Sequence, residues 1–388
     1  MQPLVTKLRF WMTPAFWTTT VFTKIRQFLS NLLDIKPKHK KDYYGIGRYL
    51  ISKRLAFSIV IALGIVCTFY ISAILPAKAA GSSVPSYKYN SVALKFYDGT
   101  VNILAADGHL AYTGQVEKGK VSGTGKLFDK ENEMLYEGLF ENNLYNGMGK
   151  LYYSGGSLKY EGEFSDNLYN GTGKLYRGNG TSEYTGQFSQ GLFSGEGVLY
   201  GFSGETVYTG SFLSGGIVFS ELPEKTTAEI SSMYTGKSTV YSSDREYCVM
   251  MDDIGAMYSA KDGSNTLDGQ WQAETIYILS EKTLIAGTEY DSIDMLATLM
   301  GSADYYGTVW INLPEAICIN SLYAGGNETI KPVSVTAASE LDSVYLVSGY
   351  DENATVYLYT FVYDGLTYTF YCNEAGANNF FMYSIQSA

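Results

Sequence analysis

Four aromatic side chains recur at a fixed spacing and are the strongest candidates for binding chemistry in this chain. Each follows a leucine, and they are 24 residues apart: Phe128, Tyr152, Tyr176 and Tyr200. Neighbouring side chains of a strand point to opposite faces, so each ring is expected on the face opposite its leucine. Because aromatic faces stack on sugars and peptides, we predict that these four form an aromatic ladder that binds a glycan or a peptide.

Residues for catalysis or metal binding are scarce. The chain has two histidines, His39 and His109, so the part beyond the N-terminal segment has no histidine pair for zinc and no choice of base for a catalytic triad. Asp252 and Asp253 could form a carboxylate pair, but adjacent acids at a helix start more often accept backbone amides. We therefore predict no catalytic residue, no metal site and no cofactor.

Two segment types imitate ligand-binding loops without meeting their requirements. Gly-Thr-Gly-Lys, at 123–126 and 171–174, lacks the earlier glycine of a phosphate-binding loop and the Ser or Thr that must follow the lysine. The segment 262–268 has a leucine where a calcium loop needs glycine. We expect ordinary repeat structure in the first case and a solvated turn in the second.

The four cysteines are too few for a disulfide framework. Cys67 lies in an apolar run. Cys318 and Cys372 lie in apolar strand-like runs and are expected to be buried. Whether these two form a disulfide, and the state of Cys248, are left open.

The ladder residues belong to a sequence repeat, which must position them. A Tyr-x-Gly motif returns every 24 residues, and an apolar residue follows each tyrosine four positions later. The first four copies add a Gly-x-Gly that starts eleven residues after the tyrosine. The motif residues are Tyr112, Gly114, Tyr136, Gly138, Tyr160, Gly162, Tyr184, Gly186, Tyr208 and Gly210.

One copy has the pattern of a β-hairpin. Tyr136, Gly138 and Phe140 alternate with the residues between them, and a period of two predicts a strand. The stretch 142–147 is rich in asparagine and can close a turn before a second strand. Hairpins stacked edge to edge bury what one hairpin cannot. We expect the glycines to let rings from the next hairpin lie against bare backbone.

The motif Tyr-Glu-Gly-x-Phe, with Gly-x-Gly-Lys-Leu-Tyr, resembles the MORN repeat (membrane occupation and recognition nexus) over residues 97–220. The resemblance implies an elongated β-hairpin array for scaffolding, dimerisation or contact with peptides and lipids, and no catalysis by the repeats. The fifth copy has residues 219–221, Phe-Ser-Glu, in place of Gly-x-Gly and is expected to be a terminal cap. Unpaired array edges also predict a homodimer.

Charge divides the chain in two. The net charge is −11, yet residues 1–54 carry +9 and the remainder −20. At the boundary, residues 55–75 carry no charge, and as a helix they would reach about 31 Å, close to a bilayer core of about 30 Å. The positive-inside rule then predicts a single-pass protein of the cell membrane, with a cytoplasmic N-terminus and residues after 78 extracytoplasmic. The alternative is a signal peptide cleaved after Ala79.

The segments that flank this run have weaker patterns. Residues 1–54 are predicted to contain a basic amphipathic helix, because apolar residues recur at helical spacing between Val21 and Leu33. Such a helix suits the anionic inner leaflet or packs on another membrane protein. Residues 76–96 are expected to be a linker.

Residues 224–388 are long enough for an independent domain, for which we predict an α+β fold of no assigned family. Helices are predicted at 248–259 and 292–300, each with Asp near its start. The pair Asp364-Gly365 is a hairpin signal. Strands are predicted at 272–279, 309–313, 343–348, 355–363, 366–372 and 379–385.

Together these patterns predict a mostly β protein with a transmembrane helix, a MORN-like hairpin array and an α+β domain. The expected function is a non-enzymatic, membrane-anchored scaffold, bacterial in origin, that displays a C-terminal binding domain to other envelope proteins and binds no nucleic acid. The alternative is a module that binds cell-wall glycan or phospholipid through the ladder, although a charge of −20 disfavours anionic lipid. An enzyme of unknown type in 224–388 is the third interpretation.

Overall fold

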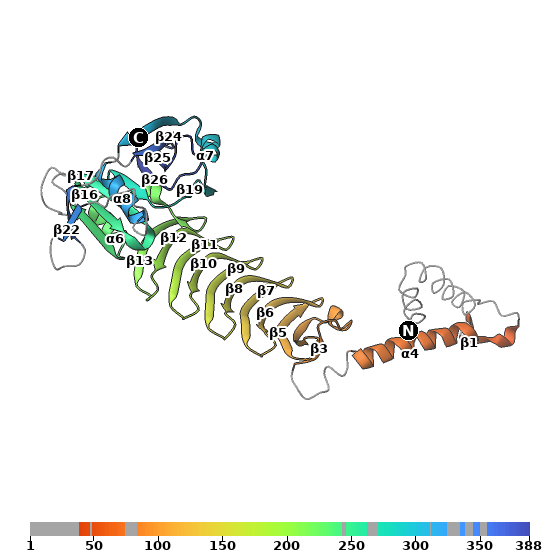
Figure 1. Cartoon of the computed structure of the whole chain (residues 1–388). Coiled ribbons are helices and arrows are strands. Elements are labelled where there is room, and N and C mark those ends of the chain that lie inside the picture. Colours follow the sequence, from red (N-terminus) through yellow and green to blue (C-terminus); the bar gives the residue numbers. More distant parts are fainter. Residues whose placement is uncertain are drawn as a thin grey trace, which may run out of the picture.

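The computed structural model describes residues 39–46, 49–73, 84–242, 246–261, 271–310, 312–323, 334–337, 344–349 and 355–388. Two large sheets dominate these residues. A long array of hairpins lies side by side along one direction and runs into a C-terminal domain (Figure 1).

The array is a 12-stranded sheet in which each strand pairs with its neighbours in sequence. All pairs are antiparallel except β3 with β4, and each 24-residue copy forms one hairpin, as predicted. β3 and the 3-10 helix η3 (Leu94–Phe96) fall within the segment 76–96 that was expected to be a linker. The strands are β3 (Ser86–Lys88), β4 (Gly99–Leu104), β5 (Leu110–Glu117), β6 (Lys120–Phe128), β7 (Met134–Glu141), β8 (Leu144–Tyr152), β9 (Leu158–Ser165), β10 (Leu168–Tyr176), β11 (Ser182–Ser189), β12 (Leu192–Tyr200), β13 (Thr206–Leu213) and β14 (Gly216–Ile217).

The hairpins close through two residues with positive φ, as type I′ turns do. At Asn142 and Asn143 the φ values are 51° and 73°. The second asparagine also links its hairpin to the preceding one, because its amide donates to the carbonyl of Val121 (2.9 Å) and its Oδ1 accepts the Val121 amide (2.8 Å). Asn167 holds Tyr145 in the same way, at 3.1 and 2.8 Å. The turn asparagines therefore tie successive hairpins together.

Each hairpin is bent at its glycines. The register of β7 and β8 shifts between Gly138 and Phe140, and Gly147 opposite this shift has a φ of 82°. Such bulges bend a strand. The bends allow a single sheet to bury Tyr136 completely, at 0% exposed.

Both edge strands of the array are short, β14 with two residues and β3 with three. Short edges are one way in which natural sheets limit pairing with other chains. Residues 219–221 form the 3-10 helix η4 (Phe219–Glu221), and the helix α6 (Thr227–Met233) then contacts β13 at the end of the array. The homodimer through the array edges stays a prediction.

The C-terminal domain is built on a 10-stranded sheet with the order β21-β24-β25-β26-β18-β17-β16-β15-β23-β22. All neighbours are antiparallel except β15 with β23. A small hairpin, β19 (Thr283–Ile285) with β20 (Thr288–Tyr290), and the helices α7 (Ile293–Met300) and α8 (Leu313–Tyr323) complete the described part of the domain. The strands of the large sheet are β15 (Ser238–Ser242), β16 (Glu246–Met251), β17 (Ala256–Lys261), β18 (Thr275–Ile278), β21 (Asp304–Trp310), β22 (Ser334–Ala337), β23 (Val344–Gly349), β24 (Thr355–Tyr363), β25 (Leu366–Cys372) and β26 (Met382–Ser387).

Several elements of this domain match the patterns in the sequence. The strands predicted at 343–348, 355–363 and 366–372 are confirmed as β23, β24 and β25, and Asp364-Gly365 closes a hairpin. The helix predicted at 292–300 is α7. The strand predicted at 272–279 is the shorter β18, and the one predicted at 379–385 is displaced to β26.

The helix predicted at 248–259 is wrong. These residues form β16, the 3-10 helix η5 (Asp252–Ile254) and β17. Cys248 and Met250 pack in one apolar cluster and Val249 and Met251 in another, so β16 is buried on both faces. A strand that is buried on both faces is apolar throughout and lacks the alternation that distinguishes it from a helix.

The strand predicted at 309–313 is also placed incorrectly. The strand β21 ends at Trp310, and Leu313 begins the helix α8. Asn312 accepts the Glu315 amide through Oδ1 (2.9 Å), and Glu315 Oε2 accepts the Asn312 amide (2.7 Å). This reciprocal pair is a capping box, which starts the helix.

The predicted transmembrane helix at 55–75 is overturned by the structure. Among the residues that the structure describes, no helix is both long enough and apolar enough to cross a bilayer. The helix there, α4 (Lys53–Ala73), includes two cations in its first turn, and positions 74 and 75 lie outside the described range. The predicted single-pass localisation is therefore corrected as well.

The remaining N-terminal elements are η2 (Lys40–Asp42) and a separate two-stranded sheet of β1 (Tyr43–Ile46) and β2 (Tyr49–Ser52). The predicted amphipathic helix between Val21 and Leu33 and the alternative cleavage site at Ala79 lie outside the described residues.

Candidate functional site

The tyrosines of the first four repeats each lie over a pair of glycines in their own hairpin. In the copy that begins at Tyr136, a Cβ on Gly138 would lie 2.5 Å from the Cα of Gly149, and a Cβ on Gly149 would clash with the tyrosine ring. The same contacts recur at Tyr112, Tyr160 and Tyr184. The ring was expected to come from the next hairpin, but it comes from the same one. The glycines are required because any side chain would occupy the space of the ring.

The hydroxyl of each of these tyrosines bonds to its own strand. Tyr136 Oη donates to the carbonyl of Leu139 at 2.8 Å, three residues further on. Tyr112, Tyr160 and Tyr184 bond in the same way to Gln115, Glu163 and Gln187, at 2.8, 2.9 and 3.1 Å. Burial raises the pKa of Tyr184 to about 12, so the phenol stays protonated and remains a donor.

A phenylalanine links each ring to the preceding hairpin. The ring centre of Phe140 is 4.9 Å from that of Tyr136 and 5.4 Å from that of Tyr112, both with edge-to-face geometry. Equivalent contacts join Phe164 to Tyr136, Phe188 to Tyr160, and Phe212 to Tyr184, at 5.3, 5.2 and 5.0 Å. The rings therefore form a continuous column along the array.

A third ring, present in three successive copies, was not predicted from the sequence. Tyr145 stacks on Tyr136 at 3.8 Å with an angle of 9° between the planes, and Tyr169 and Phe193 repeat this at 4.0 and 3.9 Å. An aromatic residue nine positions after the motif tyrosine, in three successive copies, is the signal that could have revealed it.

The aromatic ladder residues lie at the ends of β6, β8, β10 and β12, each directly after a register shift, and all four are half-buried. They are two strands apart, which corresponds to roughly 10 Å. The Nζ of Lys174 lies 5.1 Å from the ring centre of Tyr176 and covers one face of that ring. The rings are therefore evenly spaced, but one is already engaged in a cation–π contact.

A row of alternating charges crosses the face of the array that the motif tyrosines do not occupy. Lys126 pairs with Glu137 at 2.8 Å, and Lys150 with Glu161 at 2.9 Å. Glu137 lies opposite Lys150, and Glu161 opposite Lys174, so the row continues across five neighbouring strands. We call these five residues the charged row. Exposed ion pairs add little stability, about 0–1 kcal/mol each, so the charged row contributes little to the folding of the array.

The repeat motif continues past the fifth copy into the C-terminal domain, as Tyr234-Thr235-Gly236. Tyr208 forms a bridge with Tyr234, and the Thr235 amide donates to the carbonyl of Val207 at 2.9 Å. The Tyr234 hydroxyl donates to the carbonyl of Lys237, three residues further on, as in the repeats. The array and the domain are thus joined by the same interaction that builds the array.

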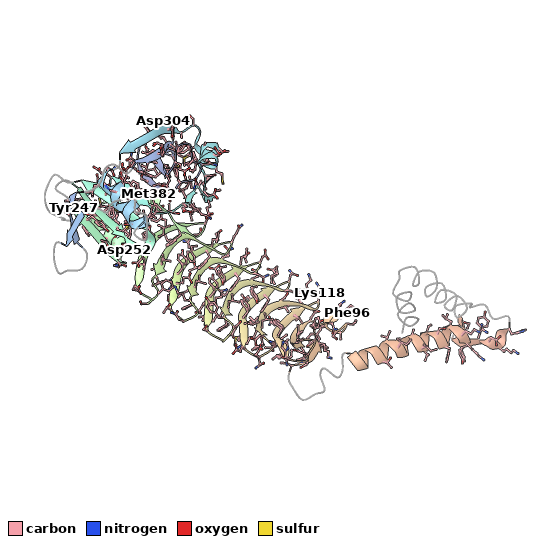
Figure 2. All side chains as sticks on the ribbon, in the orientation of Figure 1. Phe96, Lys118, Tyr247, Asp252, Asp304 and Met382 are labelled. Atoms are coloured by element: carbon pink, nitrogen blue, oxygen red, sulfur yellow. The ribbon has the colours of Figure 1, made fainter. Side chains whose placement is uncertain are left out.

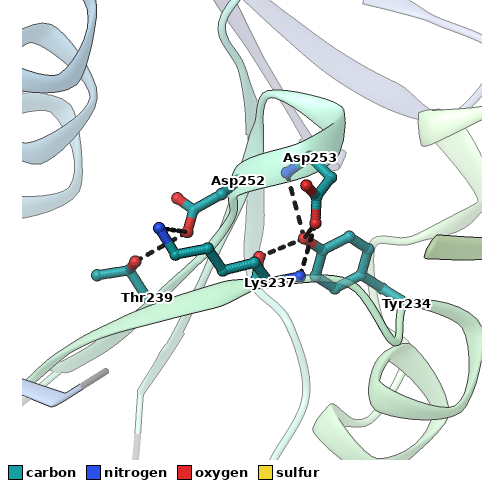
Figure 3. Close-up of polar contacts among 5 residues, drawn as sticks. All are labelled: Tyr234, Lys237, Thr239, Asp252 and Asp253. Atoms are coloured by element: carbon teal, nitrogen blue, oxygen red, sulfur yellow. Dashed lines mark hydrogen bonds and ion pairs between the residues drawn. The ribbon is translucent and has the colours of Figure 1, made fainter. Parts of the chain in front are cut away.

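Asp252 and Asp253 support this junction (Figure 3). Asp253 Oδ2 accepts the Lys237 amide at 2.6 Å and lies 3.1 Å from the Tyr234 hydroxyl. Asp252 Oδ2 accepts a bond from the Thr239 hydroxyl at 2.9 Å and lies 3.8 Å from Lys237 Nζ. Asp253 thus accepts a backbone amide, as was expected for these acids. The amide is that of Lys237, the residue before β15, and it does not belong to a helix.

The other candidates have local roles. His109 Nδ1 lies 2.5 Å from the carboxylate of Asp107 in an exposed loop. Cys248, Cys318 and Cys372 are all buried, and the disulfide left open for the last two is not formed. Burial raises the pKa of Cys372 to about 11. In the described part of the chain, no cluster of His, Cys, Asp and Glu could hold a metal ion.

The glycine pair can be tested with matched alanine substitutions. In Gly173→Ala the new Cβ would meet the ring of Tyr160, and we expect a loss of about 1–3 kcal/mol in the free energy of unfolding. Gly178, in the loop after β10, has open space around it, and Gly178→Ala should change stability by less than about 0.5 kcal/mol. Chemical denaturation of both variants measures the difference. Equal effects would contradict the proposed role of the pair.

The tyrosine hydroxyls can be tested with two phenylalanine substitutions. Tyr160→Phe removes a hydroxyl bonded to Glu163 and should cost about 0.5–1.5 kcal/mol of stability. The buried hydroxyl of Tyr208 has no partner among the described residues, so Tyr208→Phe should instead raise stability, by about 1 kcal/mol. Thermal unfolding gives the sign of each change. A shift in the same direction for both variants would count against this account.

Comparison with known families agrees with this geometry. The family model of the MORN repeat matches residues 136–158, 160–182 and 184–206. No match was found among curated proteins. The three matched segments begin at Tyr136, Tyr160 and Tyr184, which are three of the four tyrosines that lie over glycine pairs. Residues 136–206 of this chain are therefore MORN repeats.

Proposed function

We propose that this protein is a non-catalytic scaffold, in which the repeat array binds other proteins through the charged row and carries a C-terminal binding domain at its end. The observation that supports this most is the difference between the two faces of the array, because one is buried and apolar and the other is exposed and charged. The motif tyrosines and their phenylalanines are buried, at 7% exposed or less. The charged row lies on the other face, half-exposed and regularly spaced.

The connection between the array and the domain supports a scaffold function. One apolar cluster extends from Tyr87 in β3 to Ile385 in β26. The hairpin of β19 and β20 adds a contact, because Ser214 Oγ donates to the carbonyl of Gly287 at 2.9 Å. A partner on the array would therefore be held at a fixed distance and orientation from the C-terminal domain.

The charged row favours a protein partner. Its five residues alternate in sign at the spacing of neighbouring strands, about 4.8 Å. A regular alternation is matched by another ordered surface with charges of opposite sign at each position, and like charges in the wrong register are penalised. The predicted envelope partners, the homodimer and the bacterial origin stay predictions.

This proposal predicts the effect of reversing the lysines of the charged row. In the triple variant Lys126→Glu, Lys150→Glu and Lys174→Glu, proteins that co-purify with the tagged full-length chain should fall by about tenfold, because all five positions become acidic. Quantitative mass spectrometry of the captured proteins measures the change. The matched control is Lys95→Glu, Lys118→Glu and Lys130→Glu, which makes the same charge change at exposed positions outside the row. Equal loss in both triple variants, or in neither, would contradict the proposal.

The alternative function is glycan binding by the aromatic ladder, favoured by the even spacing of its four rings. It has less support, because Lys174 already covers one face of Tyr176. Tyr152→Ala with Tyr176→Ala should abolish retention on immobilised cell-wall glycan if the ladder is the site. Protein capture through the charged row should then be unchanged. If the double variant still binds glycan, the ladder is not the site.

A further inference from the structure

We infer that the C-terminal domain binds an extended, positively charged peptide segment in a cleft that runs to the edge strand β21. This inference rests on the proposed function of that domain as a binding module, and it concerns a surface separate from the charged row. Four features carry it: a cleft with a hydrogen-bonding floor, a fixed wall, an acidic lining and an edge strand at the end of the sheet.

The cleft has a volume of about 690 Å³ and lies on one face of the large sheet. Its floor crosses β17, β18, β26, β25 and β24 and reaches β21, and the paired positions Tyr277, Ser384, Thr369 and Thr360 form one row across it. Short hydroxyl and amide side chains cover the floor: Ser259, Thr275, Thr360, Thr369, Ser384 and Gln386. Such a floor offers donors and acceptors without blocking access.

The start of α8 forms a fixed wall of the cleft. Glu315 is 8% exposed, and its Oε1 accepts a hydrogen bond from the Tyr371 hydroxyl at 2.9 Å. Its other oxygen is bonded to the Asn312 amide. Ser384 lies 3.3 Å from the same tyrosine hydroxyl. This network ties the helix to β25 and β26 and keeps the shape of the cleft.

The charge of the lining selects the ligand. Glu224, Glu274 and Glu315 line the cleft, and none of its lining residues in the described part of the chain is Lys, Arg or His. Residues 55–388 as a whole carry −20. An anionic ligand is repelled by this field, and a cationic one is attracted and steered into the cleft.

The edge strand gives the ligand its extended shape. Among the described strands β21 is the last of this sheet; it has neither Lys nor Pro, and its register against β24 shifts between Tyr306 and Thr308. Asp304, at its start, lies on the outer margin of the domain (Figure 2). Tyr305 and Tyr306 are 47% and 50% exposed, and Tyr306 also lines the cleft. The cleft and the edge are therefore continuous.

A peptide that pairs with β21 uses both the edge strand and the acidic lining of the cleft. Strand addition supplies main-chain hydrogen bonds, and alternate side chains point to one face of the sheet. Those on the cleft face would enter beside Tyr306, at the β21 end of the cleft, and would be attracted by the exposed carboxylates of Glu224 and Glu274 across it. The preferred sequence therefore has Lys or Arg at every second position. A glycan could also use the hydroxyl floor, but it would gain nothing from the edge strand or from the acidic lining.

The test uses the full-length chain and fluorescently labelled peptides, with binding measured by anisotropy at physiological salt. The probe is an acetylated peptide of alternating lysine and valine. The control has the same composition in two blocks, with all lysines followed by all valines. We expect the alternating peptide to bind about tenfold tighter than the blocked one, because only its lysines all face the cleft. Equal affinity would mean attraction by net charge alone and would overturn the inference.

Two variants locate the site. Glu224→Gln with Glu274→Gln removes exposed charge from the lining and should weaken binding of the alternating peptide by about tenfold, whereas Glu117→Gln with Glu131→Gln removes the same charge from the array and should not. Tyr306→Lys places a cation where the cleft meets the edge and should also weaken it. Unchanged affinity in these cleft variants, or retention of a neutral oligosaccharide that the alternating peptide does not displace, would overturn the inference.

The outcomes separate this inference from the proposed function. The triple Lys→Glu variant of the charged row should bind the alternating peptide as the wild type does. If that variant loses its co-purifying proteins and no peptide binds the cleft, the scaffold proposal holds and this inference fails. If the alternating peptide binds the cleft and the triple variant captures as many proteins as the wild type, this inference holds and the proposed function of the array fails.

Discussion

The repeat array depends on one contact, a tyrosine ring that lies on the bare backbone of two glycines. Because neither glycine has a Cβ, the ring of Tyr136 reaches the backbone of Gly138 and Gly149, and its hydroxyl bonds to a carbonyl of its own strand. The ring is then fixed in position for the edge of Phe164 from the following copy. A side chain in place of a glycine would occupy the space of the tyrosine ring, and without the ring the bare glycine backbone would be uncovered. Tyrosine and glycine therefore recur together at a constant interval.

This contact also explains the shape and the end of the array. The stacked rings bury one face of a single sheet, so successive hairpins extend in one direction (Figure 1), while the opposite face displays the charged row. After the last copy the motif returns as Tyr234 to Gly236, but these residues do not form another hairpin of the array. There Asp253 supplies acceptors, and β15 leads into the large sheet. The array and the domain therefore share one core, and the proposed scaffold relies on that continuity.

Local chemistry in the sequence was sufficient for the repeats but not for the C-terminal domain. The asparagine-rich stretch at 142–147 contains the hairpin turn, as predicted. By contrast, β16 was mistaken for a helix because both of its faces are buried. The apolar run at 55–75 predicted a membrane span, which the structure does not support. Apolar content by itself does not say which environment covers a segment.

The sequence by itself determined the period, the hairpin unit and the need for tyrosine with glycine, because these follow from interactions between residues close together in the chain. It did not determine that the ring lies over its own hairpin, that Tyr145 adds a third ring, or that Tyr234 continues the motif. Nor did it reveal the cleft, where Glu315 meets Tyr371 from 56 residues away and Thr275 contacts Gln386 from 111 away. Such contacts are set by the order of the strands in the sheet, which only the tertiary structure decides.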